Sequence, residues 1–242
     1  KVELANVAFK GNRKMTKIVL VATSASELKG HATGLWLEEL AAPYYIFRAK
    51  GYQVLIASIG GGEIPIDASS LKGDFFTEPS QRFMEDPQAQ EKLLQSLSLK
   101  ELNIAKDQSI DAIFLTGGHG VCVDYTTSKE LKDAIESLLG RGKVVAAVCH
   151  GVVGLVSCTT TNGSPLVDGR TVTGFSNSEE DAVQLSDKVP FLLEGKLKEL
   201  GAKYERAEND WTPHVCVDGT LITGQNPQSS EACAKAVVQL LG

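Results

Sequence analysis

One cysteine stands where an α/β protein would carry a nucleophile. The apolar run 143–148 ends directly before Cys149, and His150 and Gly151 follow it. In a parallel α/β sheet the carboxyl ends of the strands border the ligand-binding crevice, so a thiol is expected there. A tight strand–turn–helix step would also place the sulfur at a helix N-terminus, which favours the thiolate. The backbone N–H of His150 would face the same cavity as one half of an oxyanion hole.

The remaining cysteines lack such a context. Cys122, Cys158, Cys216 and Cys233 are therefore expected to be ordinary core or near-surface thiols. For Cys149 itself the alternative is that it is only a small buried hydrophobe, as free cysteines often are. Five cysteines without regular spacing do not predict a disulfide framework, and a reducing compartment is expected.

A glycine-rich turn follows the apolar run 111–116. Gly118 and His119 stand in it, and the lack of a side chain on glycine lets backbone N–H groups approach a ligand closely. No phosphate-binding motif is present in the sequence. His119 fits a site residue and an ordinary surface-loop residue equally well.

Two adjacent carboxylates, Glu38 and Glu39, stand in the helical pattern 34–50. One can point into the crevice while the other faces solvent. A carboxyl group held in an apolar cleft has a raised pKa and can shuttle protons. The alternative is that both acids only complement the helix dipole.

The elements that must position these residues alternate along the chain. Apolar, β-branched runs at 17–23, 52–59, 111–116 and 143–148 predict buried parallel strands. Helical patterns lie at 34–50, 87–98 and 128–140. This succession predicts an α/β fold with a doubly wound parallel sheet sandwiched by helices.

Several further segments complete the prediction. Residues 60–106 indicate a partly helical insertion, Asp-Gly pairs predict hairpins at 167–170 and 217–220, and a closing helix is expected at 227–241. We expect an N-terminal extension over 1–14 and a single domain over 15–242.

Composition narrows the possible functions. The 24 Lys and Arg residues against 30 Asp and Glu give a net charge of −6, which argues against a general nucleic-acid binder. No apolar run is long enough for a membrane span, and residues 1–14 lack the apolar core of a signal peptide. A cytoplasmic location is therefore expected, with no nucleic-acid or membrane partner.

The motifs together resemble a known superfamily, that of the PfpI-type intracellular proteases and the Parkinson-disease deglycase. Within it the chain is similar to the heat-shock protein 31 branch, the glutathione-independent glyoxalases (glyoxalase III). The resemblance extends over residues 17–241. It rests on the Glu39 helix, Thr116-Gly117-Gly118-His119-Gly120, Ala147-Val148-Cys149-His150-Gly151, Thr173-Gly174-Phe175 with Glu179-Glu180, and the segment 211–229.

The resemblance implies a flavodoxin-like fold with class I glutamine-amidotransferase topology, a small cap from 60–106, and a homodimer. It implies that Cys149 is the nucleophile, His150 its base, and Glu39 the helix carboxylate. Glu180 becomes the acid behind the histidine, with Glu179 as the adjacent rival. Gly118, His119 and Gly151 are expected to surround the substrate and its oxyanion.

The reaction implied is conversion of methylglyoxal and related 2-oxoaldehydes to 2-hydroxy acids such as lactate, through a hemithioacetal on Cys149 and an enediol. No metal, glutathione or other cofactor is expected. Alternatives are a holding chaperone that binds unfolded proteins, a protein deglycase, a cysteine peptidase, and a redox sensor in which the thiol oxidises to sulfinic acid. A glutaminase subunit is disfavoured because the histidine is adjacent to the cysteine.

Overall fold

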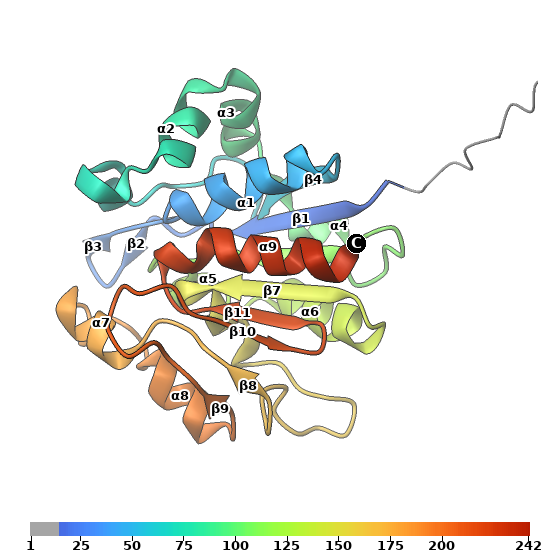
Figure 1. Cartoon of the computed structure of the whole chain (residues 1–242), viewed down its shortest axis with the longest axis vertical. Coiled ribbons are helices and arrows are strands. Elements are labelled where there is room, and N and C mark those ends of the chain that lie inside the picture. Colours follow the sequence, from blue (N-terminus) through green and yellow to red (C-terminus); the bar gives the residue numbers. More distant parts are fainter. Residues whose placement is uncertain (1–14) are drawn as a thin grey trace, which may run out of the picture.

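The computed structural model describes residues 15–242, and its centre is a seven-stranded sheet (Figure 1). The expected extension over 1–14 lies outside the described residues. The strands of this sheet are, in chain order, β1 (Lys17–Ala22), β4 (Gln53–Ser58), β5 (Leu97–Ser98), β6 (Ala112–Leu115), β7 (Val144–Val148), β10 (Val215–Asp218) and β11 (Leu221–Gly224). Their spatial order is β10-β11-β7-β6-β1-β4-β5, and all neighbours are parallel except β10 and β11.

Helices cover both faces of this sheet. In Figure 1, α1 (Glu38–Ala49) and α9 (Ser230–Leu241) lie side by side in front of it, and they also contact each other. Behind the sheet lie α5 (Val121–Asp124), α6 (Lys129–Gly140) and the 3₁₀ helix η3 (Cys149–Leu155). The predicted doubly wound α/β class is therefore confirmed.

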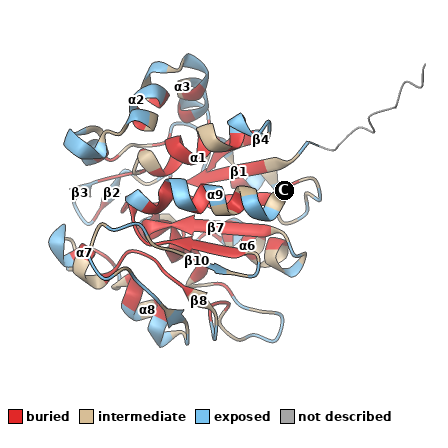
Figure 2. Cartoon of the chain, viewed as in Figure 1, coloured by how far each residue is buried: buried red, intermediate tan, exposed pale blue. Residues whose placement is uncertain are grey.

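The strands read as continuous apolar runs because helices cover them on both sides. Every residue of β7 is buried, as are all residues of β1 after Lys17 (Figure 2). Nearly all buried hydrophobic side chains of the described residues form one connected cluster.

The segment 60–106 is partly helical, as expected, and it also contributes a strand. It contains η1 (Ala68–Leu71), η2 (Gly73–Phe75), α2 (Glu78–Glu85), α3 (Pro87–Leu94), β5 and α4 (Leu99–Leu102). The helix expected over 87–98 ends at Leu94, because Leu97 and Ser98 are extended and pair with β4 at the edge of the sheet. Helix α2 packs on α1, so the segment is fastened to the main fold at two places.

The helix expected over 34–50 begins only at Glu38. The four residues before it are used otherwise: Leu35 forms a bridge with Ile66, and the Trp36 N–H donates to the carbonyl of Gly117. The Trp36 bond holds the start of α1 against the glycine-rich turn that follows β6, and the Leu35 bridge joins it to the 60–106 segment.

One predicted hairpin is confirmed and the other is wrong. Strands β10 and β11 are antiparallel and turn at Gly219, which has φ +61°. At Gly169 the chain also turns, with φ +73°, but the next strand, β8 (Thr171–Val172), pairs in parallel with β9 (Lys203–Tyr204). The Asp-Gly pair predicts a local turn correctly, but it does not determine which distant segment pairs with the strand that follows.

The remaining elements lie around the sheet edges. They are β2 (Glu27–Leu28), β3 (His31–Ala32), α7 (Asn177–Ala182), α8 (Leu193–Glu199) and the 3₁₀ helix η4 (Pro227–Ser229). The closing helix expected over 227–241 is thus η4 followed by α9.

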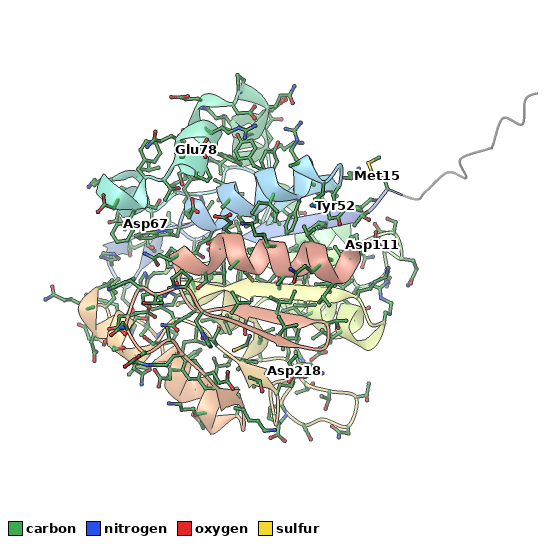
Figure 3. All side chains as sticks on the ribbon, viewed as in Figure 1. Met15, Tyr52, Asp67, Glu78, Asp111 and Asp218 are labelled. Atoms are coloured by element: carbon green, nitrogen blue, oxygen red, sulfur yellow. The ribbon has the colours of Figure 1, made fainter. Side chains whose placement is uncertain are left out.

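The carboxyl ends of the parallel strands lie together at one end of the sheet. Asp67, labelled in Figure 3, lies at this end, and Asp111 lies at the opposite end, where the strands begin. The functional candidates gather at the carboxyl ends, as expected for this fold. Across residues 15–242, no helix combines the length and apolar character needed to cross a lipid bilayer.

Candidate active site

Cys149 occupies a sharp turn between β7 and η3. Its φ is +56°, a left-handed conformation that costs a non-glycine residue about 1–2 kcal/mol and persists only where its surroundings enforce it. Gly151 makes the turn possible, because a Cβ there would come within 2.4 Å of the Leu115 carbonyl oxygen. Gly151 therefore packs the turn onto β6 and does not line the cavity described below.

The two carboxylates of α1 face different surroundings. Glu39 is fully buried, its Oε2 accepts the Gly117 N–H at 2.6 Å, and the carboxyl group lies beside the Cys149 side chain. Glu38 instead accepts the hydroxyl of Thr77, the N-cap of α2. Glu39 is thus placed for chemistry, while Glu38 fastens the 60–106 segment.

Burial decides whether the Glu39 carboxyl group and the Cys149 thiol are protonated. It raises the pKa of Glu39 from 4.5 to about 8, although hydrogen bonds from Cys149 and Gly117 oppose the rise. Glu39 is therefore mostly neutral at pH 7. Burial also raises the pKa of the Cys149 thiol well above its ordinary 9, and an ionised Glu39 would raise it further.

The backbone N–H of His150 lowers the pKa of Cys149, which is the effect that the sequence predicts for a helix N-terminus. Burial outweighs it, so the resting thiolate expected from the sequence is not supported. A neutral Glu39 changes the balance, because a carboxylic acid can donate a hydrogen bond to the thiolate as it forms.

One carboxylate holds two histidines beside the nucleophile. His150 places Nδ1 3.5 Å from Cys149 Sγ and Nε2 2.6 Å from Glu180 Oε2. The other oxygen of Glu180 lies 2.7 Å from His119 Nε2, and the two imidazole rings are 4.1 Å apart. His119 is 6% exposed, so it belongs to the site and is not a surface-loop residue.

The charges in this group depend on each other. Burial opposes ionisation of Glu180, but His150 and His119 outweigh it and hold the pKa of that carboxyl below its usual range. Burial, with the neighbouring His150, lowers the pKa of His119. Glu180 is therefore ionised and can orient His150 as a base whose Nδ1 faces the sulfur.

Glu179, the rival acid, points away from the histidines. It forms a capping box with Ser176 at the start of α7. Its Oε1 accepts the Trp211 N–H at 2.9 Å, Gln225 Nε2 at 3.0 Å and Asn226 Nδ2 at 2.8 Å. The structure thus places Glu180 against His150 and makes Glu179 an anchor for the loop that carries Trp211.

A cavity of about 500 Å³ opens over Cys149. Gly118, His119 and His150 line it beside the sulfur, and its walls are largely aromatic: Trp36, Phe75, Phe175 and Trp211. The sequence does not predict that these four side chains share one cavity, since they come from separate segments without common spacing. The available signals are that Phe175 lies within a motif and that both tryptophans of the chain flank motif segments.

The Gly118 backbone fits this wall only without a side chain. Its φ is +91°, and a Cβ there would lie 2.3 Å from the Gly34 carbonyl oxygen. Gly118 therefore brings its backbone, and with it a candidate oxyanion donor, to the edge of the cavity.

Three ligand-type side chains meet at the site: His119, His150 and Glu180. Their N–O separations of 2.6 and 2.7 Å are hydrogen-bond distances. Two ligands of one tetrahedral zinc ion would stand about 3.3 Å apart, given bonds of about 2.0 Å. As placed, these residues fit a proton relay better than a metal centre.

Residues 31–240 match the sequence profile of the DJ-1/PfpI family. Glyoxalase 3 of Candida albicans is 30% identical over 238 residues, which cover 93% of this chain and 98% of that protein. A glutathione-independent glyoxalase of Saccharomyces cerevisiae is 32% identical, with the same coverage. The crystal structure of the Candida albicans glyoxalase III superposes with a TM-score of 0.84 at 27% identity, covering 93% of this chain and 97% of that one. The Rapid Encystment Protein of 24 kDa from Francisella tularensis gives a TM-score of 0.88 at 38% identity, covering 94% and 100%.

Proposed function

The chain belongs to the DJ-1/PfpI family, and on this premise we propose that it converts methylglyoxal and related 2-oxoaldehydes to 2-hydroxy acids without glutathione. Relatives named as glyoxalases support this enzyme class, since about 30% identity with them extends over most of the chain. The observation that carries the proposal is the placement of Cys149 between a neutral Glu39 and the His150–Glu180 pair.

The first step uses the thiol and its base. Cys149 passes its proton to His150 Nδ1, and the sulfur attacks the aldehyde carbon of the substrate. The oxygen that becomes negative takes a proton from the neutral Glu39 and is held by the backbone N–H groups of Gly118 and His150. The product of this step is a hemithioacetal on the sulfur.

The second step moves hydrogen between neighbouring carbons. Glu39, ionised in the first step, removes the proton from the former aldehyde carbon, and protonated His150 gives its proton to the ketone oxygen, which yields an enediol. Glu39 then returns its proton to the adjacent carbon while His150 takes the proton from the hydroxyl of the former aldehyde carbon. The resulting thioester is hydrolysed by water, which restores the thiol. Methylglyoxal and water together account for all the atoms of lactate, so the proposal needs no metal or redox cofactor.

The enclosure of the nucleophile favours a small substrate over a protein. Cys149 is only 3% exposed, beneath aromatic walls. A peptide bond in a folded protein could not reach the sulfur, which disfavours the cysteine peptidase. Protein deglycation at Cys149 would need wider access than this cavity offers.

We also propose that residues 15–242 act as one domain capped by 60–106, as a homodimer in the cytoplasm. The resemblance to the family supports the cap and the dimer, and the five free cysteines favour a reducing compartment. Sedimentation equilibrium of the full chain tests the dimer, for which a mass of twice 25.9 kDa is expected.

The decisive experiment follows lactate formation from methylglyoxal with glutathione absent and a chelator present. We expect turnover by the reduced wild type, a loss of at least about 1,000-fold in Cys149→Ala, and a loss of about 100-fold or more in Glu39→Gln. Cys158→Ala is the matched control, because that thiol is equally buried and bonds only to the Gly154 carbonyl. Absence of lactate from the reduced wild type would overturn the proposal, as would full activity in Cys149→Ala.

A further inference from the structure

A second group of metal-ligating side chains lies outside the catalytic cavity. Cys216 is on β10, His214 directly precedes that strand, and Glu205 directly follows β9. Cys216 Sγ lies 3.6 Å from His214 Nε2 and 4.0 Å from Glu205 Oε2, and all three ligand atoms are within 4.8 Å of one another. Residues two apart along an extended segment point to the same side, which explains why the thiol and the imidazole meet.

The spacing suits an ion in the centre. With a Zn–S bond of about 2.3 Å and a Zn–N bond of about 2.0–2.1 Å, tetrahedral geometry requires sulfur and nitrogen to stand about 3.5–3.6 Å apart. The observed 3.6 Å matches this value. The Glu205 carboxylate must approach the sulfur by only a few tenths of an ångström, which an exposed side chain can do.

We propose that Glu205, His214 and Cys216 bind a zinc ion, with solvent in the fourth position. A thiolate, an imidazole and a carboxylate form the mixed S, N, O set that zinc accepts. Binding exchanges the thiol proton of Cys216 for the metal, so one proton is released into solution. The thiolate and the carboxylate together balance the two positive charges of the ion.

The site has a direct structural connection to the catalytic cavity. Glu205 and His214 bracket the loop 206–213, and Trp211 of this loop forms one wall of the cavity. The backbone of His214 is itself held, since its N–H donates to Ser229 Oγ and its carbonyl accepts from Gln225. A bound ion would therefore tie both ends of the Trp211 loop to β10.

Cobalt(II) is the probe that reports the sulfur ligand directly. The full-length reduced protein, stripped of metal, is titrated with Co²⁺, and zinc affinity is then measured by competition with a chromophoric chelator. We expect one equivalent of Co²⁺ to produce a thiolate-to-cobalt charge-transfer band. Cys216→Ser should abolish this band and weaken zinc binding at least about 100-fold, since the only thiolate ligand is lost. Cys149→Ser should retain both, which separates this site from the catalytic thiol.

Two further variants keep the test decisive if Cys216→Ser does not fold. His214→Asn should weaken zinc binding by a similar factor, and Glu205→Gln about tenfold, because the exposed carboxylate is the most weakly held ligand. Glu208→Gln is the matched control on the same loop and should bind as the wild type does. A missing band in the wild type, or a band that survives in Cys216→Ser or is lost in Cys149→Ser, overturns the proposal. Metal binding is the only readout, so the result is independent of the proposed enzymatic function.

Discussion

Replacing Glu39 by glutamine should change how the stability of the protein depends on pH. In the folded protein burial raises the pKa of Glu39 from 4.5 to about 8. Between these two values the folded state holds a proton that the unfolded state releases, so wild-type stability falls as pH rises. Below pH 4.5 both states are protonated and above pH 8 both are ionised, so the effect is confined to this window.

The size of the effect follows from the same two values. Each pH unit in the window lowers the wild-type free energy of unfolding by about 1.4 kcal/mol, which gives about 5 kcal/mol over the whole window. Glutamine has nearly the same shape and can still accept the Gly117 N–H, but it cannot ionise. The stability of Glu39→Gln relative to wild type should therefore rise by about 3 kcal/mol between pH 5.5 and 8.5.

Urea unfolding at half-unit pH steps measures this difference. The comparison ends at pH 8.5, below the range in which the thiol of Cys149 begins to titrate. Glu91→Gln on α3 is the control, because this carboxylate is exposed and its difference curve should be flat. A flat difference curve for Glu39→Gln would mean that Glu39 is already ionised in the folded protein at neutral pH. The reasoning that makes Glu39 a proton donor would then fail.

Three further predictions test other parts of the site. Gly118→Ala should lower the free energy of unfolding by at least about 2 kcal/mol and abolish activity, since its Cβ would meet the Gly34 carbonyl oxygen at 2.3 Å. Gly163→Ala is the control: Gly163 has φ +86° and open space around it, so this variant should lose only about 1 kcal/mol of stability and keep full activity. Equal losses of stability for the two variants in urea unfolding would contradict this prediction. Glu179→Gln should lower the unfolding free energy by about 2 kcal/mol, because the buried carboxylate accepts five hydrogen bonds and the amide replaces one of its two acceptor oxygens by a donor. An unchanged thermal midpoint would refute that role. The aromatic cavity of about 500 Å³ should accept phenylglyoxal with a kcat/KM at least equal to that for methylglyoxal, and a loss greater than tenfold in steady-state assays would show that the cavity is smaller in solution.

The sequence predicts the fold well where elements are uniformly buried. The apolar runs that became β1, β4, β6 and β7 need no knowledge of their partners, since a strand covered on both faces is apolar throughout. The two-residue strand β5 carries no such signal. Its pairing with β4 depends on where the 60–106 segment folds back, which local sequence does not encode.

The active site also has parts that local sequence predicts and parts that depend on distant segments of the chain. The turn at Cys149 is local, and strand, cysteine, histidine and glycine together predict it. The bond between Glu180 and His119 joins residues 61 positions apart, and nothing near His119 in the chain distinguishes a ligand-facing loop from a solvent-facing one. The pKa of Cys149 differs from the sequence prediction for a related reason: burial, which raises it, depends on the whole fold, while the helix N-terminus is local.

The one-residue ambiguity between Glu179 and Glu180 reflects how the site is built. Consecutive residues on a helix point about 100° apart, so only one of the pair can face His150. The capping box between Ser176 and Glu179 fixes where α7 begins and therefore which acid turns toward the histidines. Glu179 also anchors the backbone of Trp211, so one short helix sets both the orientation of the base and the position of a cavity wall. Each buried acid therefore has its own partners, His150 for Glu180 and the Trp211 backbone for Glu179. A shift of α7 by one residue would break both sets of hydrogen bonds together.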